Sequence, residues 1–180
     1  MLTEKPLVKF WLVSIRSLLP SRLQKKPTVK ILKYRTLLSN MNLREELVDI
    51  ALRWQNRFGV APSITSAVSE YDAAMLVGMT ESEYSQYMQD KTAVSKGADF
   101  VFRGISYQVK ANRPSGKKGS PVTLVPKAMN YNWDRLIWIL YDKNYVMQEA
   151  WEWCVDDYIT AFNFKKRLSP DDYRRGNRLF

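Results

Sequence analysis

Residues 98–111 contain the feature that most restricts how this chain can fold. Apolar and polar side chains alternate on both sides of Arg103-Gly104, which is typical of two short strands joined by a two-residue turn. All the apolar residues then share one side, and a shift of one residue would move them to the other. The residue numbers of facing partners sum to 207, and the expected pairs are Phe102 with Ile105, Phe100 with Tyr107 and Ala98 with Val109.

The opposite face of this hairpin gathers an acid, an amide and a lysine. Asp99 falls directly opposite Gln108, and Lys110 follows two residues later on the same face. Such groups can form a small polar site, but they are also ordinary residues of a solvated hairpin face. The spacing alone leaves both interpretations open.

The rest of the chain after residue 40 alternates between helical and extended patterns. Leu136 to Tyr141 is continuously apolar, which predicts a central strand that is covered on both faces. The tail from Arg167 to Phe180 is polar and basic. The other expected elements are amphipathic helices over 43–58 and 64–77, a short surface helix over 80–91, strands over 121–125 and 145–153, and a helix over 156–164.

The positive charge of the protein is concentrated at one end of the sequence. The formal net charge is +10, and residues 1–40 contain nine basic residues and one acid. We therefore expect a basic N-terminal extension over 1–40 and one folded domain over 41–180. The extension could be an arm that binds DNA phosphates or a segment that lies on a membrane surface. It could equally be translated upstream sequence that is not part of the native protein, with Met41 as the true start.

The composition excludes several kinds of chemistry and also limits the location and partners of the protein. The chain has no His and a single cysteine, Cys154, which excludes His-based nucleophile activation, His-ligated zinc and an internal disulfide. The apolar stretch Phe10–Leu19 is too short and too interrupted to span a bilayer, so no membrane span is expected. The positive charge favours a polyanionic partner, nucleic acid before anionic membrane. The scarcity of cysteine fits a reducing, cytoplasmic location.

The acid, the amide and the lysine of the hairpin carry a resemblance to a known family. Asp99 followed by Gln108-Val109-Lys110 resembles the PD-(D/E)XK signature of restriction-endonuclease-like nucleases, in a subset that has Gln at the second acidic position. That subset includes a small homing endonuclease built on this fold. The similarity covers residues 60–155 and implies an α/β fold with an α-β-β-β-α-β core, in which helices flank a mixed central sheet. Two departures are that Ala98 replaces the usual Pro and that Gln108 brings no charge.

The resemblance implies Mg²⁺-dependent hydrolysis of phosphodiester bonds in double-stranded DNA. Asp99, Gln108, the Val109 carbonyl and Glu70 would hold the metal, and Lys110 would orient the attacking water. Glu70 lies at the edge of the apolar stripe of the second helix, about 100° from its centre. Asp72, on the other side of that stripe, is the weaker candidate.

Two basic clusters are candidate DNA contacts. One follows the site strand in a Gly-rich loop, which is otherwise typical of a flexible solvated turn, and the other lies near the C-terminus. A domain of about 140 residues presents one active site, so cutting both strands implies a homo-oligomer, either a dimer or a tetramer. If the organism is prokaryotic, we expect the protein on the nucleoid. The candidate contacts are Arg113, Lys117, Lys118 and Lys127 in and after the loop, and Arg174 and Arg175 in the tail.

Rival functions follow from the same sequence. A catalytically decayed DNA-binding domain of this fold is the main alternative, because Gln108 brings no charge to the metal. A membrane-surface or structural protein governed by its basic extension is another. Within the nuclease hypothesis, homing and restriction roles share the same chemistry, and the sequence does not separate them.

Overall fold

The computed structural model describes residues 42–89, 91, 97–115, 117, 119 and 121–180. The chain divides into two units, residues 1–42 and 43–180, and the second holds every element described below. The expectations for residues 1–40 lie outside the described residues. In the described part of the chain, no helix has both the length and the apolar character needed to cross a membrane.

Within the described residues three helices come first, as the sequence predicts. They are α3 (Leu43–Phe58), α4 (Thr65–Leu76) and α5 (Glu81–Gln89). Acidic residues in the first turn of α3 favour its start, and Gly59, with φ +85°, directly follows its last residue. Gly78, with φ +86°, likewise follows the end of α4.

The predicted hairpin is present, and two of its three expected pairs form in the predicted register. The expected pair of Ala98 with Val109 is wrong, because β1 pairs only with residues 105–107 and Ala98 packs with a different core cluster from Val109. Strands β1 (Phe100–Phe102) and β2 (Ile105–Asn112) are antiparallel, with Phe100 facing Tyr107 and Phe102 facing Ile105. Arg103 and Gly104 both have positive φ angles, 50° and 78°, which is the geometry of a type I′ turn.

The sheet has five strands in the order β1-β2-β3-β4-β5. The later strands are β3 (Arg135–Tyr141), β4 (Met147–Cys154) and β5 (Asn177–Arg178). The pairing of β2 with β3 is parallel, and the other pairings are antiparallel, so the sheet is mixed. Strand β3 lies between β2 and β4, and its residues from Leu136 to Ile139 are fully buried, as its apolar sequence predicts.

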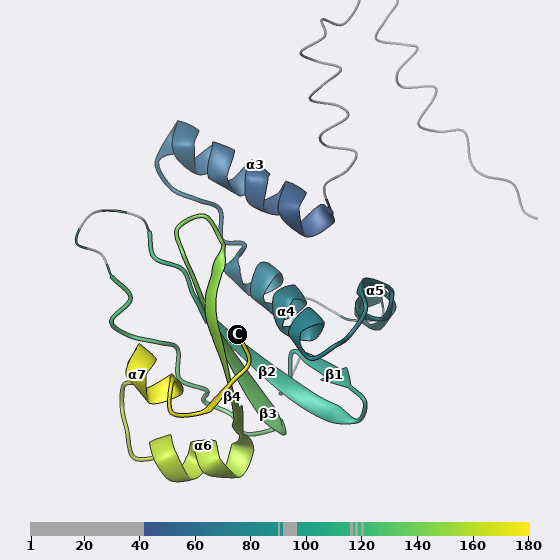
Figure 1. Cartoon of the computed structure of the whole chain (residues 1–180), viewed down its shortest axis with the longest axis vertical. Helices are drawn as coiled ribbons and strands as arrows, with labels where there is room; N and C mark the ends of the chain where they lie inside the picture. The colour runs from purple at the N-terminus through teal and green to yellow at the C-terminus, as the bar shows by residue number, and fades with distance from the viewer. Residues whose placement is uncertain (1–41, 90, 92–96, 116, 118, 120) are drawn as a thin grey trace, which may run out of the picture. The chain divides into compact units, whose positions relative to one another are not determined.

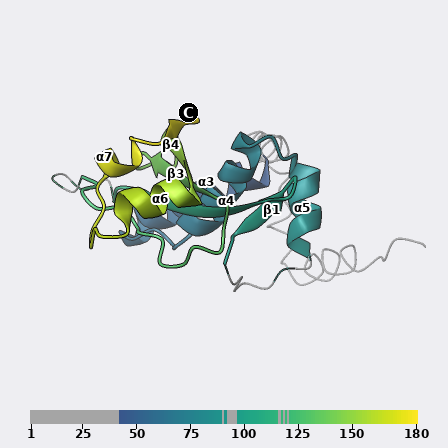
Figure 2. The ribbon, with the colours of Figure 1, turned by 90° about the horizontal axis from the view of Figure 1, so that it is seen from below.

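Helices cover both faces of this sheet (Figures 1 and 2). On one face, Val68 and Ala74 of α4 pack with Tyr107, Val109 and Ile137 of the sheet. On the other, the short helices α6 (Val155–Phe162) and α7 (Pro170–Tyr173) pack on Trp138 and Trp153. The protein is therefore a mixed α/β protein with a five-stranded sheet between two helical layers.

One expectation about the later chain is wrong. Residues 121–125 form no strand, and only Val125 makes an isolated bridge, with Leu168. Pro121 begins this segment and Pro126 directly follows it, and their lack of an N–H group disfavours a ladder there.

The tail, for which the sequence analysis predicts no helix or strand, forms two short elements. It contains α7, which begins with a capping box between Ser169 and Asp172, and β5, which pairs with β4. The buried ring of Tyr173 stacks on Trp138. The tail is thus part of the second helical layer and of the sheet edge.

Candidate functional site

The candidate site lies at the open edge of β2, next to the point where β1 begins. Strand β1 pairs only with residues 105–107, and Asp99 directly precedes it. Beside Val109 and Lys110, β2 therefore has β3 on one side and, among the described strands, none on the other. Groups from both faces of the sheet can meet at such an edge.

A pocket of about 300 Å³ occupies this position. It contains Glu70 from α4, Asp99 before β1, and Val109 and Lys110 from β2, four of the residues that sequence reasoning selected. They come from three segments that are distant in the sequence. The other lining residues are Thr65, Ser66 and Ser69 of α4, Ala111 of β2, and Pro126.

Asp99 is held in place by β2. Its Oδ2 atom accepts a hydrogen bond from the Val109 backbone N–H at 2.6 Å and another from the amide of Gln108, which is buried. Its own backbone N–H donates to the Tyr107 carbonyl at 2.8 Å. Burial raises the pKa of Asp99, while the Val109 N–H, the charge of Lys110 and the Gln108 amide oppose that rise. In this arrangement Gln108 positions Asp99.

Glu70 is the second carboxylate of the pocket, and its titration is strongly perturbed. Burial and the nearby charge of Asp99 raise the pKa of Glu70 to about 7, and the positive charge of Lys110 acts in the opposite direction. Two half-buried carboxylates near one lysine form a local excess of negative charge when both are ionised. A cation between them would relieve that excess.

The donor set fits a hard divalent cation such as Mg²⁺, with few charged ligands. Two carboxylates are the ligands that Mg²⁺ prefers, with water completing its shell. Among the described residues there is no cluster of three or more His, Cys, Asp or Glu that could hold a metal. Any ion would therefore depend on Glu70 and Asp99 for its charged contacts.

Sequence reasoning missed the small polar residues of α4 that line the pocket. Thr65, Ser66 and Ser69 precede Glu70 on the helix, and the Ser69 hydroxyl donates to the Ser66 carbonyl at 3.0 Å. The sequence does contain a signal for them, because these polar residues are spaced one, three or four positions apart within a largely apolar helix and so share one side of it. Pro126 follows no strand of the sheet, and we find no sequence signal for its place in the pocket.

Asp72, the weaker acidic candidate, has a structural role. Its carboxylate forms a two-pronged ion pair with Arg44 of α3, at 3.0 and 2.7 Å. It also accepts a hydrogen bond from the Tyr141 hydroxyl at 2.7 Å. Arg44 in turn donates to the Tyr145 carbonyl at 3.0 Å. This network ties α3 to α4 and to the end of β3.

The candidate DNA contacts of the loop differ in their availability. The guanidinium of Arg113 donates to Gln55 and to the Lys143 carbonyl, and it lies 4.4 Å from the centre of the Tyr145 ring. Lys127 donates to two backbone carbonyls, those of residues 163 and 165. Lys117 is exposed, and Lys118 lies outside the described residues.

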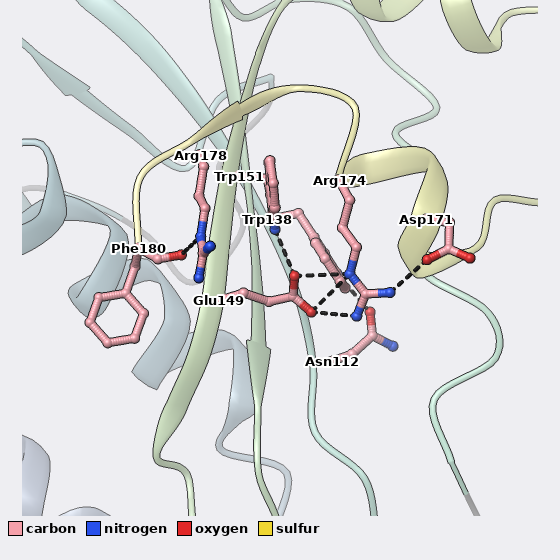
Figure 3. A network of polar contacts seen from close by, with 8 residues as sticks. All are labelled: Asn112, Trp138, Glu149, Trp151, Asp171, Arg174, Arg178 and Phe180. Atoms are coloured by element: carbon pink, nitrogen blue, oxygen red, sulfur yellow. Dashed lines mark hydrogen bonds and ion pairs between the residues drawn. The ribbon is translucent and has the colours of Figure 1, made fainter.

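The two candidate arginines of the tail, Arg174 and Arg175, also differ, and Figure 3 shows the contacts of Arg174. Arg174 donates to the carboxylates of Glu149 on β4 and Asp171 on α7, with contacts of 2.5 to 3.1 Å. The hydrogen bonds to these two acids raise the pKa of Arg174 above its ordinary value. Trp151 also donates to Glu149, at 2.8 Å. Arg174 thus fastens the tail to the sheet, whereas Arg175 is exposed.

Comparisons with known proteins give no family for this chain. No protein-family model matches the sequence, and the search of curated proteins finds no match either.

Proposed function

We propose that this protein is a Mg²⁺-dependent endonuclease that hydrolyses phosphodiester bonds of double-stranded DNA, of the homing or restriction type. The observation that carries the proposal is the pocket at the edge of β2, which is lined by Glu70, Asp99 and Lys110. The resemblance of Asp99, Gln108-Val109 and Lys110 to the PD-(D/E)XK signature supports the same chemistry. The mixed sheet between helical layers is compatible with a restriction-endonuclease-like fold.

Each residue of the pocket has a separate role in the proposal. Asp99 and Glu70 hold the ion, and the Val109 carbonyl is a further candidate ligand. Mg²⁺, when bound, supplies positive charge that stabilises the phosphate as negative charge develops. Lys110 orients the attacking water and offsets part of that charge. Gln108 keeps Asp99 in position through its amide hydrogen bond.

The proposal also implies contacts with the DNA backbone. Lys117 and Arg175 are exposed and free to meet phosphates, while Arg113, Lys127 and Arg174 first have to exchange or share the intramolecular partners described above. Cleavage of both strands requires a homo-oligomer with one pocket per chain. The protein would act in the cytoplasm, on the nucleoid if the organism is prokaryotic.

The direct test is cleavage of plasmid DNA by the full chain, with and without Mg²⁺, followed by mapping of the cut ends. We expect Mg²⁺-dependent nicking or linearisation at defined positions. Lys110→Ala should lose at least about 100-fold in cleavage rate while it still binds DNA. Lys166→Ala, which changes an exposed lysine that does not line the pocket, is the matched control and should cut normally. Normal cutting by Lys110→Ala would refute the assignment.

One observation favours the catalytically decayed DNA-binding domain as the second candidate. The amide at position 108 donates to Asp99, so the pocket has two carboxylates where the family pattern has a further acid beside the lysine. This candidate predicts DNA binding without Mg²⁺-dependent nicking in the same assay. Replacing Gln108 with Glu would then restore a charged ligand, and gain of nicking by that variant would identify the decayed form.

A further inference from the structure

Helix α3 exposes a stripe of large apolar side chains. The helix packs on the protein through a different side, where Val48 and Ala51 are buried. Contiguous apolar surface of this kind marks interaction sites on soluble proteins. The exposed stripe has relative exposures between 36% and 75%, and it comprises Leu43, Leu47, Ile50, Trp54 and Phe58.

The spacing of the stripe suits another helix. Its members follow one another at intervals of four, three, four and four residues, which makes a narrow seam along the helix axis. Intervals of three and four residues are the pattern through which two helices pack side by side. The stripe extends over all 16 residues of α3.

The charges beside the seam indicate the direction of the partner helix. Glu46 lies in the first half of α3, and Arg53 and Arg57 lie in the second half, where Arg53 also pairs with Asp49 of the same helix at 2.8 Å. An antiparallel copy of the same helix would place the acidic half of each chain beside the basic half of the other. The helix dipole also favours this order of charges, but it does not account for large apolar side chains in water.

A groove beside the seam supplies the complementary shape. It has a volume of about 560 Å³, lies between α3, α4 and α5, and is lined by Leu43 and Leu47 together with Tyr71, Tyr84 and Met88. The groove therefore meets the first half of α3.

The projecting side chains are at the other end of the same helix. The rings of Trp54 and Phe58 lie 4.6 Å apart and are both more than half exposed. In an antiparallel pair, the second half of one α3 lies against the first half of the other. The paired rings of each chain would thus reach the groove of its partner, and one surface would be complementary to itself.

We propose that two copies of this chain associate through α3, antiparallel across a two-fold axis, with Trp54 and Phe58 of each copy in the groove of the other. This interface does not depend on the chemistry of the pocket at β2. If the protein is a nuclease, the same pairing would join two active sites in one particle, which is what cutting both strands requires.

Sedimentation of the full chain over a range of concentrations up to about 200 µM tests the interface. We expect a reversible dimer, or a tetramer if a second interface exists. Ile50→Glu changes a residue that is exposed in the single chain, so the fold should be unaffected, and we expect the dissociation constant to rise at least about 100-fold. Phe164→Glu, at an exposed apolar residue next to α6, is the matched control and should associate like the wild type.

A charge exchange tests the antiparallel direction and remains informative if Ile50→Glu is unstable. Glu46→Arg places arginines opposite arginines in an antiparallel homodimer, and Arg53→Glu places acids opposite acids, so each variant alone should dissociate. An equal mixture of the two should associate again, because every Arg then faces a Glu. Tryptophan fluorescence verifies that each variant is folded.

Three results would overturn the proposal. The first is a wild-type chain that stays monomeric over the whole concentration range, which is the result expected if residues 1–40 cover the stripe or if α3 binds anionic vesicles instead. The second is an oligomer that Ile50→Glu leaves unchanged, which would place the interface elsewhere. The third is failure of the mixed charge variants to associate, which would exclude the antiparallel arrangement.

Discussion

Replacing Glu70 with Gln should make the protein more stable at high pH and should remove part of its pH dependence. Burial and the nearby Asp99 carboxylate raise the pKa of Glu70 from 4.5 to about 7. The folded protein therefore binds more protons than the unfolded chain between these two values. The contribution of Glu70 to the free energy of unfolding is therefore fully present below about pH 4.5, is lost as the pH rises through this window, and is absent above about pH 7.

The size of the effect follows from the same pKa difference. Each pKa unit corresponds to about 1.4 kcal/mol, so the change from 4.5 to about 7 corresponds to roughly 3 kcal/mol. Because Glu70 is only half-buried, water screens part of this free energy, and we expect about 1–2 kcal/mol. The neutral amide of Gln avoids the penalty. Glu70→Gln should thus gain about 1–2 kcal/mol over the wild type at high pH and little or nothing at low pH.

Urea unfolding at about pH 4.5 and about pH 8, followed by tryptophan fluorescence, measures the difference. The chain contains no His, so no side chain with an ordinary pKa near neutrality obscures the Glu70 transition. Glu81→Gln changes an exposed glutamate at the start of α5 and is the control, with the pH dependence of the wild type.

Magnesium should reverse the wild-type penalty. At high pH, added Mg²⁺ should stabilise the wild type by about 1 kcal/mol at a concentration several times its dissociation constant, and should stabilise Glu70→Gln less. Proton competition at Glu70 should also weaken Mg²⁺ binding as the pH falls below about 7. If the wild type and Glu70→Gln lose stability in parallel between low and high pH, then Glu70 does not titrate in the pocket, and the electrostatic argument fails.

Further substitutions test other contacts of the site and the fold. Gln108→Ala removes a hydrogen bond to Asp99 and should raise the Mg²⁺ concentration for half-maximal stabilisation about tenfold, and an unchanged titration would refute a positioning role. Asp72→Asn leaves Arg44 without its ionic partner and should reduce stability by about 2–4 kcal/mol in urea unfolding, whereas a neutral result would make the network dispensable. Gly176→Ala brings a Cβ within 2.5 Å of the Glu152 carbonyl oxygen and should destabilise the protein by about 1–3 kcal/mol in urea unfolding. An unchanged urea midpoint would show that the tail shifts to make room for the methyl group.

The hairpin was predictable because its signals agree. The alternation of apolar and polar residues fixed the register, and Gly104 permitted the turn, so the contact of Asp99 with Gln108 followed from the sequence. The buried strand β3 was predictable from its continuous apolar run for a similar reason. Both depend on interactions within or between adjacent segments.

Other features depended on contacts between distant segments. The apolar stripe of α3 defines the helix in the sequence, but Arg44, on another side of the helix, anchors it to Asp72. The tail appeared polar because Arg174 and Asp171 are charged. Arg174, however, pairs with both Glu149 of β4 and Asp171 of α7, and so holds α7 against the sheet. Charge pairs of this kind depend on tertiary geometry that periodicity does not encode.

The position of the pocket is explained by the shortness of β1, which begins only at Phe100. Gly97 has φ +98°, a conformation that side-chain-bearing residues rarely adopt, and a Cβ there would lie 3.1 Å from the Asn132 carbonyl. The chain bends at this glycine, two residues before Asp99, and does not follow β2 past residue 107. Val109 and Lys110 are therefore not covered by a neighbouring strand on this side, and Glu70 of α4 reaches the same pocket. A longer β1 would pair with this part of β2 and close the edge at which the pocket lies. The shortness of this strand therefore makes the hairpin a candidate site.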